Sequence, residues 1–269
     1  NSKIHFTNPD CKTAGLSRQS GISASLRQYG QTELTDVTFL VPLRIDSPER
    51  RENADTLIKY TFRHFNTSFI VLEADATRKY FPEVEYEGFQ YVFIEDVNEV
   101  FHRTKWINRL ILLARTPFIA VWNADAIAPP EQILNAIELL RAGQVVMSFP
   151  YDGKFYSCDK ISSDLFKKIP DIEILIKRVP VMQLMHGYHS VGGAFIVNKD
   201  KYLETGGENE NFYGWGLEDT ERVKRLEIIN LPVYYSPGFL FHLWHPIREN
   251  SWFANSEIER KNRLELQKT

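Results

Sequence analysis

Three short segments of the chain carry side chains that could do chemistry together. An Asn-Ala-Asp segment ends at Asp125, a His-x-x-His pair joins His242 and His245, and two acids, Glu218 and Asp219, follow a glycine-rich stretch. Carboxylate oxygens suit hard divalent cations, and imidazoles suit borderline ones such as Mn²⁺ or Zn²⁺. A carboxylate within reach of a substrate hydroxyl can act as a general base. The residue types therefore predict a divalent-cation site beside a base.

Each segment also has an ordinary structural interpretation. Asn and Asp are common in turns between a strand and a helix, and Glu218 could simply cap a helix N-terminus, where the dipole favours anions. In an extended strand His242 and His245 would point to opposite faces, one into the core and one to the surface. Both can bind one cation only if the chain turns after His242, and Pro246 favours such a turn.

The stretch from Gly206 to Glu221 mixes glycines, aromatic rings and acids. Glycine loses more conformational entropy on folding than other residues, and neighbouring carboxylates repel one another, so a packed core has little use for this mixture. It suits a mobile sugar-binding loop that delivers a carboxylate. Within it, Trp215 is either a stacking platform for a sugar ring or a core residue. The pair Gly192 and Gly193 either lets the backbone approach a ligand or marks a strand bulge.

Apolar runs alternate with helical patterns through the first half of the chain, which predicts a wound parallel sheet with right-handed crossovers. The predicted strands are Asp36–Ile45, Ser68–Asp75, Gln90–Glu95, Pro117–Trp122 and Val145–Phe149, and the predicted helices are Arg51–Phe65, His102–Ala114 and Glu131–Ala142. Pro42 is expected to stop the pairing of the first strand. Polar side chains then lie at the carboxyl ends of strands, where open α/β sheets bind ligands. They are Arg44, Asp46, Glu73 and Asp75.

The second half of the chain has a different pattern. Residues 154–179 are mixed and charged, which predicts a long excursion over the surface. Beyond them we expect strands within 186–197, 231–235 and 238–246, helices at 201–203 and 218–229, and a helical tail from Glu257. Residues 1–35 are polar and predict an arm or short surface helices. The sequence contains neither the dinucleotide fingerprint G-x-G-x-x-G after its first strand nor a P-loop.

The composition is that of a soluble globular protein with room for one sizeable α/β core or two small ones, since 43% of its 269 residues are hydrophobic and 25% are charged. A net charge of -3 disfavours a non-specific nucleic-acid binder. Two cysteines, Cys11 and Cys158, make neither a disulfide framework nor a metal site and favour a reducing compartment. No apolar run has the length of a membrane span, and no signal peptide opens the sequence. We expect a cytoplasmic protein, or one peripheral to the inner face of a membrane, and leave open an anchor outside this sequence.

Two longer segments have the form of family motifs. Residues 101–108 are Phe-His-Arg-Thr-Lys-Trp-Ile-Asn, and residues 214–219 are Gly-Trp-Gly-Leu-Glu-Asp. They resemble the Phe-Asn-Arg-Ala-Lys-Leu-Leu-Asn helix and the Gly-Trp-Gly-Gly-Glu-Asp motif of the β-1,4-galactosyltransferase-like group of GT-A glycosyltransferases, with its bacterial and chondroitin-polymerase-type relatives. The resemblance runs from about Asp36 to about Pro246.

The resemblance implies a GT-A α/β fold, a Rossmann-like mixed sheet flanked by helices, in a single domain over residues 36–250. Residues 36–150 would form the nucleotide-binding half and residues 151–250 the acceptor and metal half. An arm at 1–35 would precede the domain, and a helical tail at 251–269 would follow it.

The same resemblance implies a metal-dependent, inverting enzyme that moves a sugar from a UDP-sugar to a hydroxyl of a glycan or glycolipid acceptor, as in polysaccharide biosynthesis. The sugar would be Gal, GalNAc, Glc or GlcNAc, and the cofactor Mn²⁺ or another divalent cation such as Mg²⁺. Nucleic acid is not an expected partner. The chain departs from the family pattern at Asn123, which replaces an aspartate, at Leu217, which replaces a glycine, and at Val191, which replaces an aromatic residue.

Carried over by position, the resemblance implies roles for several site residues, and the neighbouring residues are expected to contribute further contacts. The implied base is Asp219, and the implied metal ligands are Asp125, His242 and His245. The expected donor contacts are Arg44, Asp46, Glu73, Lys105, Asn123, Ala124, Gly192 and Gly193. The expected acceptor contacts are Tyr213, Trp215 and Glu218.

Two other functions stay open. A nucleotidyltransferase that makes nucleotide-sugars would need a glycine-rich, lysine-containing loop after the first strand, and the segment from Pro42 to Asp46 is not such a loop. An inactive relative of the same fold that binds glycans or nucleotide-sugars is the stronger alternative, because Asn123 lacks the charge of the family's aspartate. Sugar binding without metal dependence would support it.

Overall fold

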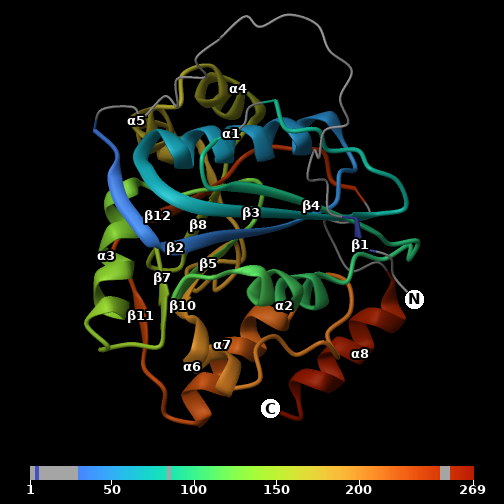
Figure 1. Ribbon diagram of the computed structural model, residues 1–269. Helices are drawn as coiled ribbons and strands as arrows, with labels where there is room; N and C mark the ends of the chain where they lie inside the picture. The colour runs from blue at the N-terminus through green and yellow to red at the C-terminus, as the bar shows by residue number, and fades with distance from the viewer. Residues whose placement is uncertain (1–3, 6–29, 84–85, 249–254) are drawn as a thin grey trace, which may run out of the picture.

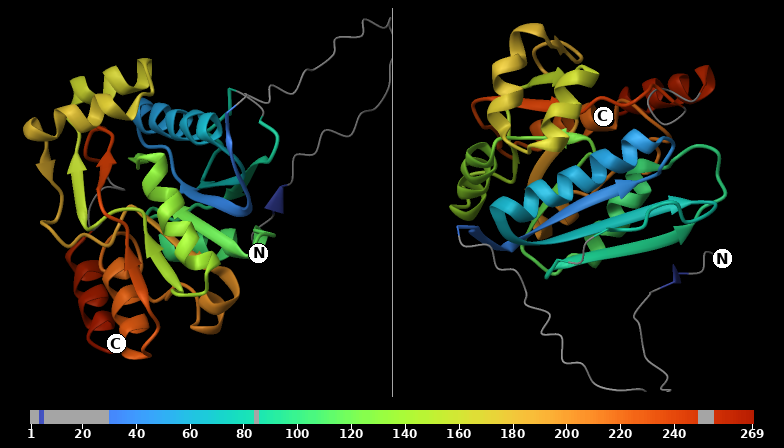
Figure 2. Two further views of the ribbon diagram at one scale, coloured as in Figure 1. Left: turned by 90° about the vertical axis from the view of Figure 1, so that its left-hand side faces the viewer. Right: turned by 90° about the horizontal axis from the view of Figure 1, so that it is seen from above.

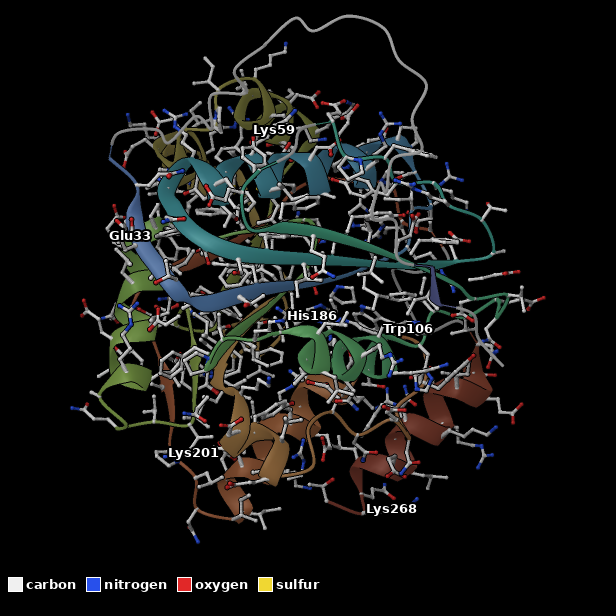
Figure 3. The ribbon with its side chains drawn as sticks, in the orientation of Figure 1. Glu33, Lys59, Trp106, His186, Lys201 and Lys268 are labelled. Carbon is white, nitrogen blue, oxygen red and sulfur yellow. The ribbon has the colours of Figure 1, made fainter. Side chains whose placement is uncertain are left out.

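The computed structural model describes residues 4–5, 30–83, 86–248 and 255–269. Within these residues an eight-stranded sheet and a four-stranded sheet form the centre of the molecule. Helices cover both faces of the larger sheet, with α1 (Pro48–His64) on one face and α2 (Arg103–Leu113) on the other (Figure 1). In Figure 3, Lys59 marks α1 and Trp106 marks α2.

The first half of the chain alternates strands and helices, as its pattern predicts. The strands are β2 (Thr32–Leu43), β3 (Phe65–Asp75), β4 (Phe89–Glu95) and β5 (Phe118–Trp122), and the helices are α1, α2 and α3 (Pro130–Arg141). Strands β4, β3, β2 and β5 are neighbours in that order and run parallel. Their centres are buried between helices, which explains the near-continuous apolar runs in the sequence. The predicted parallel sheet is confirmed for these strands.

Pro42 does not stop the pairing of β2, so that prediction is wrong. The strand continues to Leu43, and Pro42 lies opposite Leu72 of β3. On its other side β2 pairs with β5 only as far as Leu40. Beyond Leu40 the strand therefore has a partner on one side only, and proline is tolerated in such edge-like positions because it lacks an N–H to donate.

Residues 154–179 are not a surface excursion, so that prediction is also wrong. They form β8 (Lys154–Ser157), α4 (Lys160–Lys168) and α5 (Ile172–Arg178). Strand β8 runs parallel to β12 (Phe239–His242), while Phe166 of α4 and Leu175 of α5 are fully buried. Figure 2 shows α4 and α5 in yellow, beside α1 in blue. Each element is short and buries few apolar residues, so its periodicity is too brief to recognise in the sequence.

The second half of the chain makes the larger sheet mixed, which confirms the predicted fold class. Strand β10 (Ala194–Asn198) is antiparallel to both of its neighbours, β5 and β7 (Met147–Phe149). Strand β11 (Val233–Tyr235) runs parallel to β7, and β1 (Ile4–His5) pairs with β4 at the opposite edge. The other elements of this half are η1 (Val179–Val181), β9 (Gln183–Leu184), α6 (Lys199–Glu204) and α7 (Glu218–Ile228).

The smaller sheet joins the two halves of the chain next to the carboxyl end of β5. Its order is β6-β12-β8-β9, in which β6 comprises Ala126–Ile127. His242 of β12 lies opposite Ala126, and the backbone N–H of Leu243 donates to the carbonyl of Asp125 at 2.8 Å. This pairing brings the segment after β5 against the end of β12.

The helix predicted for the tail is present as α8 (Ser256–Leu266), and it lies beside α7 (Figures 1 and 2). Of the arm predicted at 1–35, only residues 4–5 and 30–35 are described, and β2 already begins within it at Thr32. Cys11 lies outside the described residues, whereas Cys158 is a buried free thiol. No helix in the described part of the chain combines the length and the apolar character that a bilayer span requires.

Candidate active site

A carboxylate and two imidazoles meet at the carboxyl end of β5. Asp125 lies between β5 and β6, His242 is the last residue of β12, and His245 follows three residues later. One ligand atom from each lies within 4.8 Å of the other two. The Nε2 atom of His242 is 3.6 Å from Oδ1 of Asp125, and Nε2 of His245 is 3.2 Å from Oδ2. Because β12 ends at His242, the chain leaves the strand before His245. The two imidazoles can therefore face the same cation, which they could not do in one continuous strand.

The surroundings of this cation cluster (Asp125, His242 and His245) suit a divalent ion. Asp125 is 2% exposed, and its Oδ1 atom has no hydrogen-bond partner among the described residues. A buried carboxylate oxygen without a partner is costly, and a cation would supply the missing contact. Burial alone would raise the pKa of Asp125, but the nearby His242 and His245 side chains hold this pKa below its usual value. Burial also lowers the pKa of His242, which favours the neutral imidazole that binds metals.

Arg50 of α1 also reaches the cation cluster, although no motif in the sequence marks it. Its Nε donates to Oδ1 of Asp46 at 2.9 Å, and its Nη1 donates to Oδ2 of Asp125 at 3.3 Å. Its Nη2 lies 3.4 Å from Nε2 of His245. The four-residue spacing from Asp46 to Arg50, at the carboxyl end of β2, is the signal that could have found this pair. The guanidinium shares the Asp125 carboxylate with any cation that binds there.

A second group of polar side chains surrounds Asp219 at the start of α7. Arg103 donates from Nη2 to Oδ1 of Asn123 at 2.9 Å. Its Nη1 lies 3.4 Å from Oε1 of Glu218 and 3.6 Å from Oδ1 of Asp219. Since Asn123 is two residues from Asp125, Arg103 connects the cation cluster with the predicted base.

Lys105 of the family-like helix motif is an expected donor contact, but Arg103 is the residue of this helix that joins the group around Asp219. The ammonium of Lys105 lies over the ring of Trp106, 4.4 Å from the ring centre. Residues two apart on a helix point in different directions, so the side chain of Lys105 does not lie beside that of Arg103. Arg103 is the first residue of α2, at the end of the helix that meets the strand ends, and this position is the signal that could have identified it.

A buried ion pair holds Asp219. Nη1 of Arg222 donates to Oδ1 of Asp219 at 2.8 Å, while its Nε and Nη2 donate to the two oxygens of Glu208, each at 2.8 Å. The side chains of Arg222 and Glu208 are 0% and 2% exposed. The hydroxyl of Tyr202 donates to Glu208 at 2.7 Å, and the guanidinium lies over the ring of Phe195. A base that a second group orients is typical of catalytic sites. Sequence analysis misses Arg222, although it lies three residues from Asp219 on the same helix.

Glu218 and Asp219 have different surroundings although they are neighbours in the sequence. Glu218 is 4% exposed and its Oε2 atom has no hydrogen-bond partner among the described residues, whereas the side chain of Asp219 is 26% exposed. Burial and the charge of Asp219 raise the pKa of Glu218 to about 7, and Arg103 opposes this rise. Asp219 is therefore the more accessible of the two carboxylates.

The raised pKa of Glu218 predicts an unusual pH dependence of stability. The folded protein holds the carboxyl proton of Glu218 more tightly than the unfolded chain does, where the pKa is the ordinary 4.5. This proton therefore adds to the free energy of unfolding in full below pH 4.5, and its contribution is lost as the pH rises to about 7. At about 1.4 kcal/mol per pH unit, the loss is about 3 kcal/mol. Glu218→Gln mimics the protonated form. Urea unfolding should therefore show equal stabilities near pH 4.5 and a more stable variant above pH 7.5, and a difference that does not change with pH would contradict the prediction.

Gly192 and Gly193 lie against both groups of side chains. A Cβ atom on Gly192 would come within 2.8 Å of Oδ2 of Asp219. Gly193 has φ +83°, and its carbonyl accepts from the backbone N–H of Asn123 at 2.8 Å. Ala124, the neighbour of Asn123, is buried. The two glycines therefore allow a close approach of backbone to the predicted base and to the Asn-Ala-Asp segment.

Trp215 lies in the turn before α7, together with Tyr213. Its half-buried ring is centred 5.8 Å from the ring of His186. The turn is left-handed at Gly214, Gly216 and Leu217, with φ angles of +76°, +104° and +74°. A leucine is strained in this conformation, so contacts from other elements must hold the turn.

Arg44 and Glu73, which we expect as donor contacts, are buried and bonded inside the fold. Arg44 is 8% exposed and Glu73 is 0% exposed. Glu73 accepts from the backbone N–H groups of Lys79 and Tyr80. Arg44 donates to Asp96 and to the carbonyls of Ala74, Asn98 and Glu99. These bonding partners lie in β3 and in the segments that follow β3 and β4, and the hydrogen bonds found among the described residues join neither Arg44 nor Glu73 to the cation cluster or Asp219.

Comparison with known proteins agrees with the predicted fold. Residues 173–245 match the family model described as the N-terminal domain of galactosyltransferase. A variant of Drosophila β1,4-galactosyltransferase 7, solved with manganese, UDP-Gal and xylobiose, is similar at 15% sequence identity and a TM-score of 0.52, with 85% of this chain and 79% of that chain covered. The catalytic domain of the Drosophila enzyme with xylobiose is similar at 16% identity and a TM-score of 0.50, with 86% and 80% covered. No curated protein matches the sequence.

The family match covers part of the candidate site. The matched residues include β10, α7 and both histidines of the cation cluster. The chain therefore has the GT-A fold of the glycosyltransferases, and over residues 173–245 it is similar in sequence to the galactosyltransferases.

Proposed function

We propose that this chain is a metal-dependent, inverting glycosyltransferase that moves a sugar from a UDP-sugar to a hydroxyl of a glycan or glycolipid acceptor. The observation that carries the proposal is that the segment from Asn123 to Asp125 contacts both groups of polar side chains. Asp125 belongs to the cation cluster, and Asn123 and Asp219 both contact Arg103. A diphosphate held at the first group would lie next to a base in the second. The galactosyltransferase match, and the manganese and UDP-Gal in the Drosophila complex, support this function.

Asp219 is suited to accept the proton of the attacking hydroxyl. Its side chain is partly exposed, and Arg222 and Arg103 hold one of its two oxygens. As the hydroxyl oxygen bonds to the anomeric carbon, the bond from that carbon to the diphosphate breaks, and its electron pair leaves with UDP. The hydroxyl proton passes to Asp219. Because this is a single in-line displacement, the configuration of the anomeric carbon inverts.

Asp125, His242 and His245 would hold the cation, which we propose to be Mn²⁺. When bound, this ion would supply positive charge against the departing diphosphate. Arg50 and Arg103 add positive charge beside the same segment of chain. The half-buried ring of Trp215 offers an aromatic face to a sugar.

Mn²⁺ is expected to stabilise the protein through the cation cluster. At a free concentration one hundred times the dissociation constant, binding raises the free energy of unfolding by about 2.7 kcal/mol. Asp125→Asn and His245→Ala should lose most of this gain, because each removes a ligand atom. Thermal unfolding of EDTA-treated protein, with and without Mn²⁺, measures the effect. His189→Ala, at an exposed histidine outside the cluster, should keep the full shift. An equal shift in the wild type and in His245→Ala would refute the ligand assignment.

Nucleotide release in the presence of Mn²⁺, a panel of nucleotide-sugars and candidate glycan acceptors tests the proposed function directly. We expect a UDP-sugar to be turned over, the rate to rise with acceptor, and EDTA to stop the reaction. If no donor is bound and none is turned over, the proposal is wrong.

Asn123 favours one other candidate function, a glycan- or nucleotide-sugar-binding protein of the same fold without turnover. Its side-chain oxygen accepts from Arg103, and it brings no charge to a cation. Such a protein would bind sugar equally well in EDTA and would release no nucleotide. Equilibrium binding of UDP-sugars with Mn²⁺ and with EDTA separates the two functions.

A further inference from the structure

The C-terminal helix α8 contacts the turn that carries Trp215 and leads into Asp219. The helix packs beside α7 (Figure 1) and lies outside the residues that match the galactosyltransferase family. Several of its side chains are polar and exposed, but Asn262 is 1% exposed. A buried amide needs hydrogen-bond partners, and those of Asn262 belong to the turn.

Asn262 bonds to the backbone on both sides of Trp215. Its Oδ1 atom accepts from the N–H of Tyr213 at 3.2 Å, and its Nδ2 atom donates to the carbonyls of Tyr213 and Gly216, each at 3.1 Å. One side chain thus satisfies three backbone groups of a four-residue turn. Three residues further along α8, Glu265 accepts from the side chains of Asn209 and Asn211, which precede the turn.

The turn needs this external support. Gly214, Gly216 and Leu217 are left-handed, and leucine is strained there. Leu217 occupies the N-cap of α7 and makes no side-chain cap bond, so the first turn of α7 is not fixed by its own cap. That first turn contains Asp219. Movement of the Tyr213–Gly216 segment would therefore displace both the aromatic platform and the base.

We propose that Asn262 is a positioning residue for the transfer reaction. By bonding to Tyr213 and Gly216 it fixes the turn, and with it the ring of Trp215 and the carboxylate of Asp219. The catalytic part of this inference rests on the proposed function, whereas the fixing of the turn does not. Through these bonds to the backbone of the turn, helix α8 would belong to the architecture of the site.

Asn262→Ala and Asn262→Asp test the proposal. Aspartate has the size of asparagine and keeps an acceptor for the Tyr213 N–H, but it cannot donate to the two carbonyls. It therefore separates hydrogen bonding from packing. We expect kcat to fall about 10- to 100-fold in both variants, with KM for the donor within about threefold of the wild type. The Mn²⁺ stabilisation should be kept, because other elements build the cation cluster.

Hydrogen exchange gives a second measurement that needs no turnover. Backbone amides in residues 206–221 should exchange about tenfold faster in both Asn262 variants, with β2 to β5 unchanged. The control is Arg263→Ala on the exposed face of α8, where the guanidinium pairs with Glu259 of the same helix. It should change neither kcat nor exchange in residues 206–221.

Three results would overturn the positioning role. The first is unchanged hydrogen exchange in residues 206–221, and the second is a kcat within about twofold of the wild type in both variants. The third is a decrease in kcat in Asn262→Ala alone, which would assign the effect to packing. A wild-type protein that transfers no sugar would instead refute the proposed function. In that case the exchange measurement still decides whether Asn262 holds the turn.

Discussion

Replacing Asp219 with asparagine is expected to reduce sugar transfer by about 10²- to 10⁴-fold. The amide has the size of the carboxylate and can stay beside Arg222, but it cannot take the proton of the acceptor hydroxyl. Binding of UDP and Mn²⁺ should survive, because the cation cluster and Asn123 belong to other elements. Steady-state transfer assays and calorimetric titration with UDP measure the two effects separately.

Two neighbouring acids show whether the loss is specific to Asp219. Glu221 is 3% exposed, and Arg225 donates to it at 2.9 Å, so Glu221→Gln removes a carboxylate from the same helical turn and should keep most of the transfer activity. Glu218→Gln tests the rival base, whose pKa is raised to about 7. If Glu218→Gln abolishes transfer and Asp219→Asn retains it, then Glu218 is the base and our assignment is wrong.

Among the substitutions considered, Arg222→Met is expected to cause the largest loss of stability. It leaves Glu208, which is buried, without its counter-charge. Breaking a buried ion pair by removing one partner costs about 3–5 kcal/mol. Urea unfolding at pH 7 measures the loss. Arg263→Met removes an exposed arginine that pairs with Glu259, and it should cost at most about 1 kcal/mol.

The double variant Glu208→Gln/Arg222→Met tests the cause of that loss. Because glutamine removes the stranded charge, the double variant should be more stable than Arg222→Met alone. Additive losses, or a loss below about 1 kcal/mol for Arg222→Met, would contradict this account. Transfer should also decrease in Arg222→Met, since Asp219 loses its closest hydrogen-bond donor.

The parallel part of the sheet could be predicted because its signal is local. Strands β2, β3 and β5 are largely buried between helices, so each contains an apolar run that can be recognised without knowing its neighbours. The segment at 154–179 could not be predicted in this way. Its strand and helices are short. Phe166 of α4 is recognisable as a core residue only once Tyr60 of α1 lies against it, with ring centres 5.5 Å apart.

The cation cluster could be proposed from residue types, but its arginines could not. Few functions need an aspartate at a strand end together with a His-x-x-His pair, so their chemistry is specific. Arginines are common on helices, and Arg50, Arg103 and Arg222 differ from the others only in what they face. The same dependence on neighbouring elements explains why Arg44, an expected donor contact, is instead bonded inside the fold. A polar residue at a strand end can point to a ligand or into the next loop, and only the path of residues 96–99 decides which.

Because β12 must pair with β6, the cation cluster can form only after β12 has been synthesised. Asp125 and His242 are separated by roughly 120 residues, so at about 5–20 residues per second the carboxylate precedes its partners by on the order of 6–24 s. A nascent chain that has not yet reached β12 holds one ligand of the three. An unfinished chain on the ribosome is therefore expected to bind no divalent cation at Asp125, because β12, the last strand among the described residues, and His245 complete the cluster.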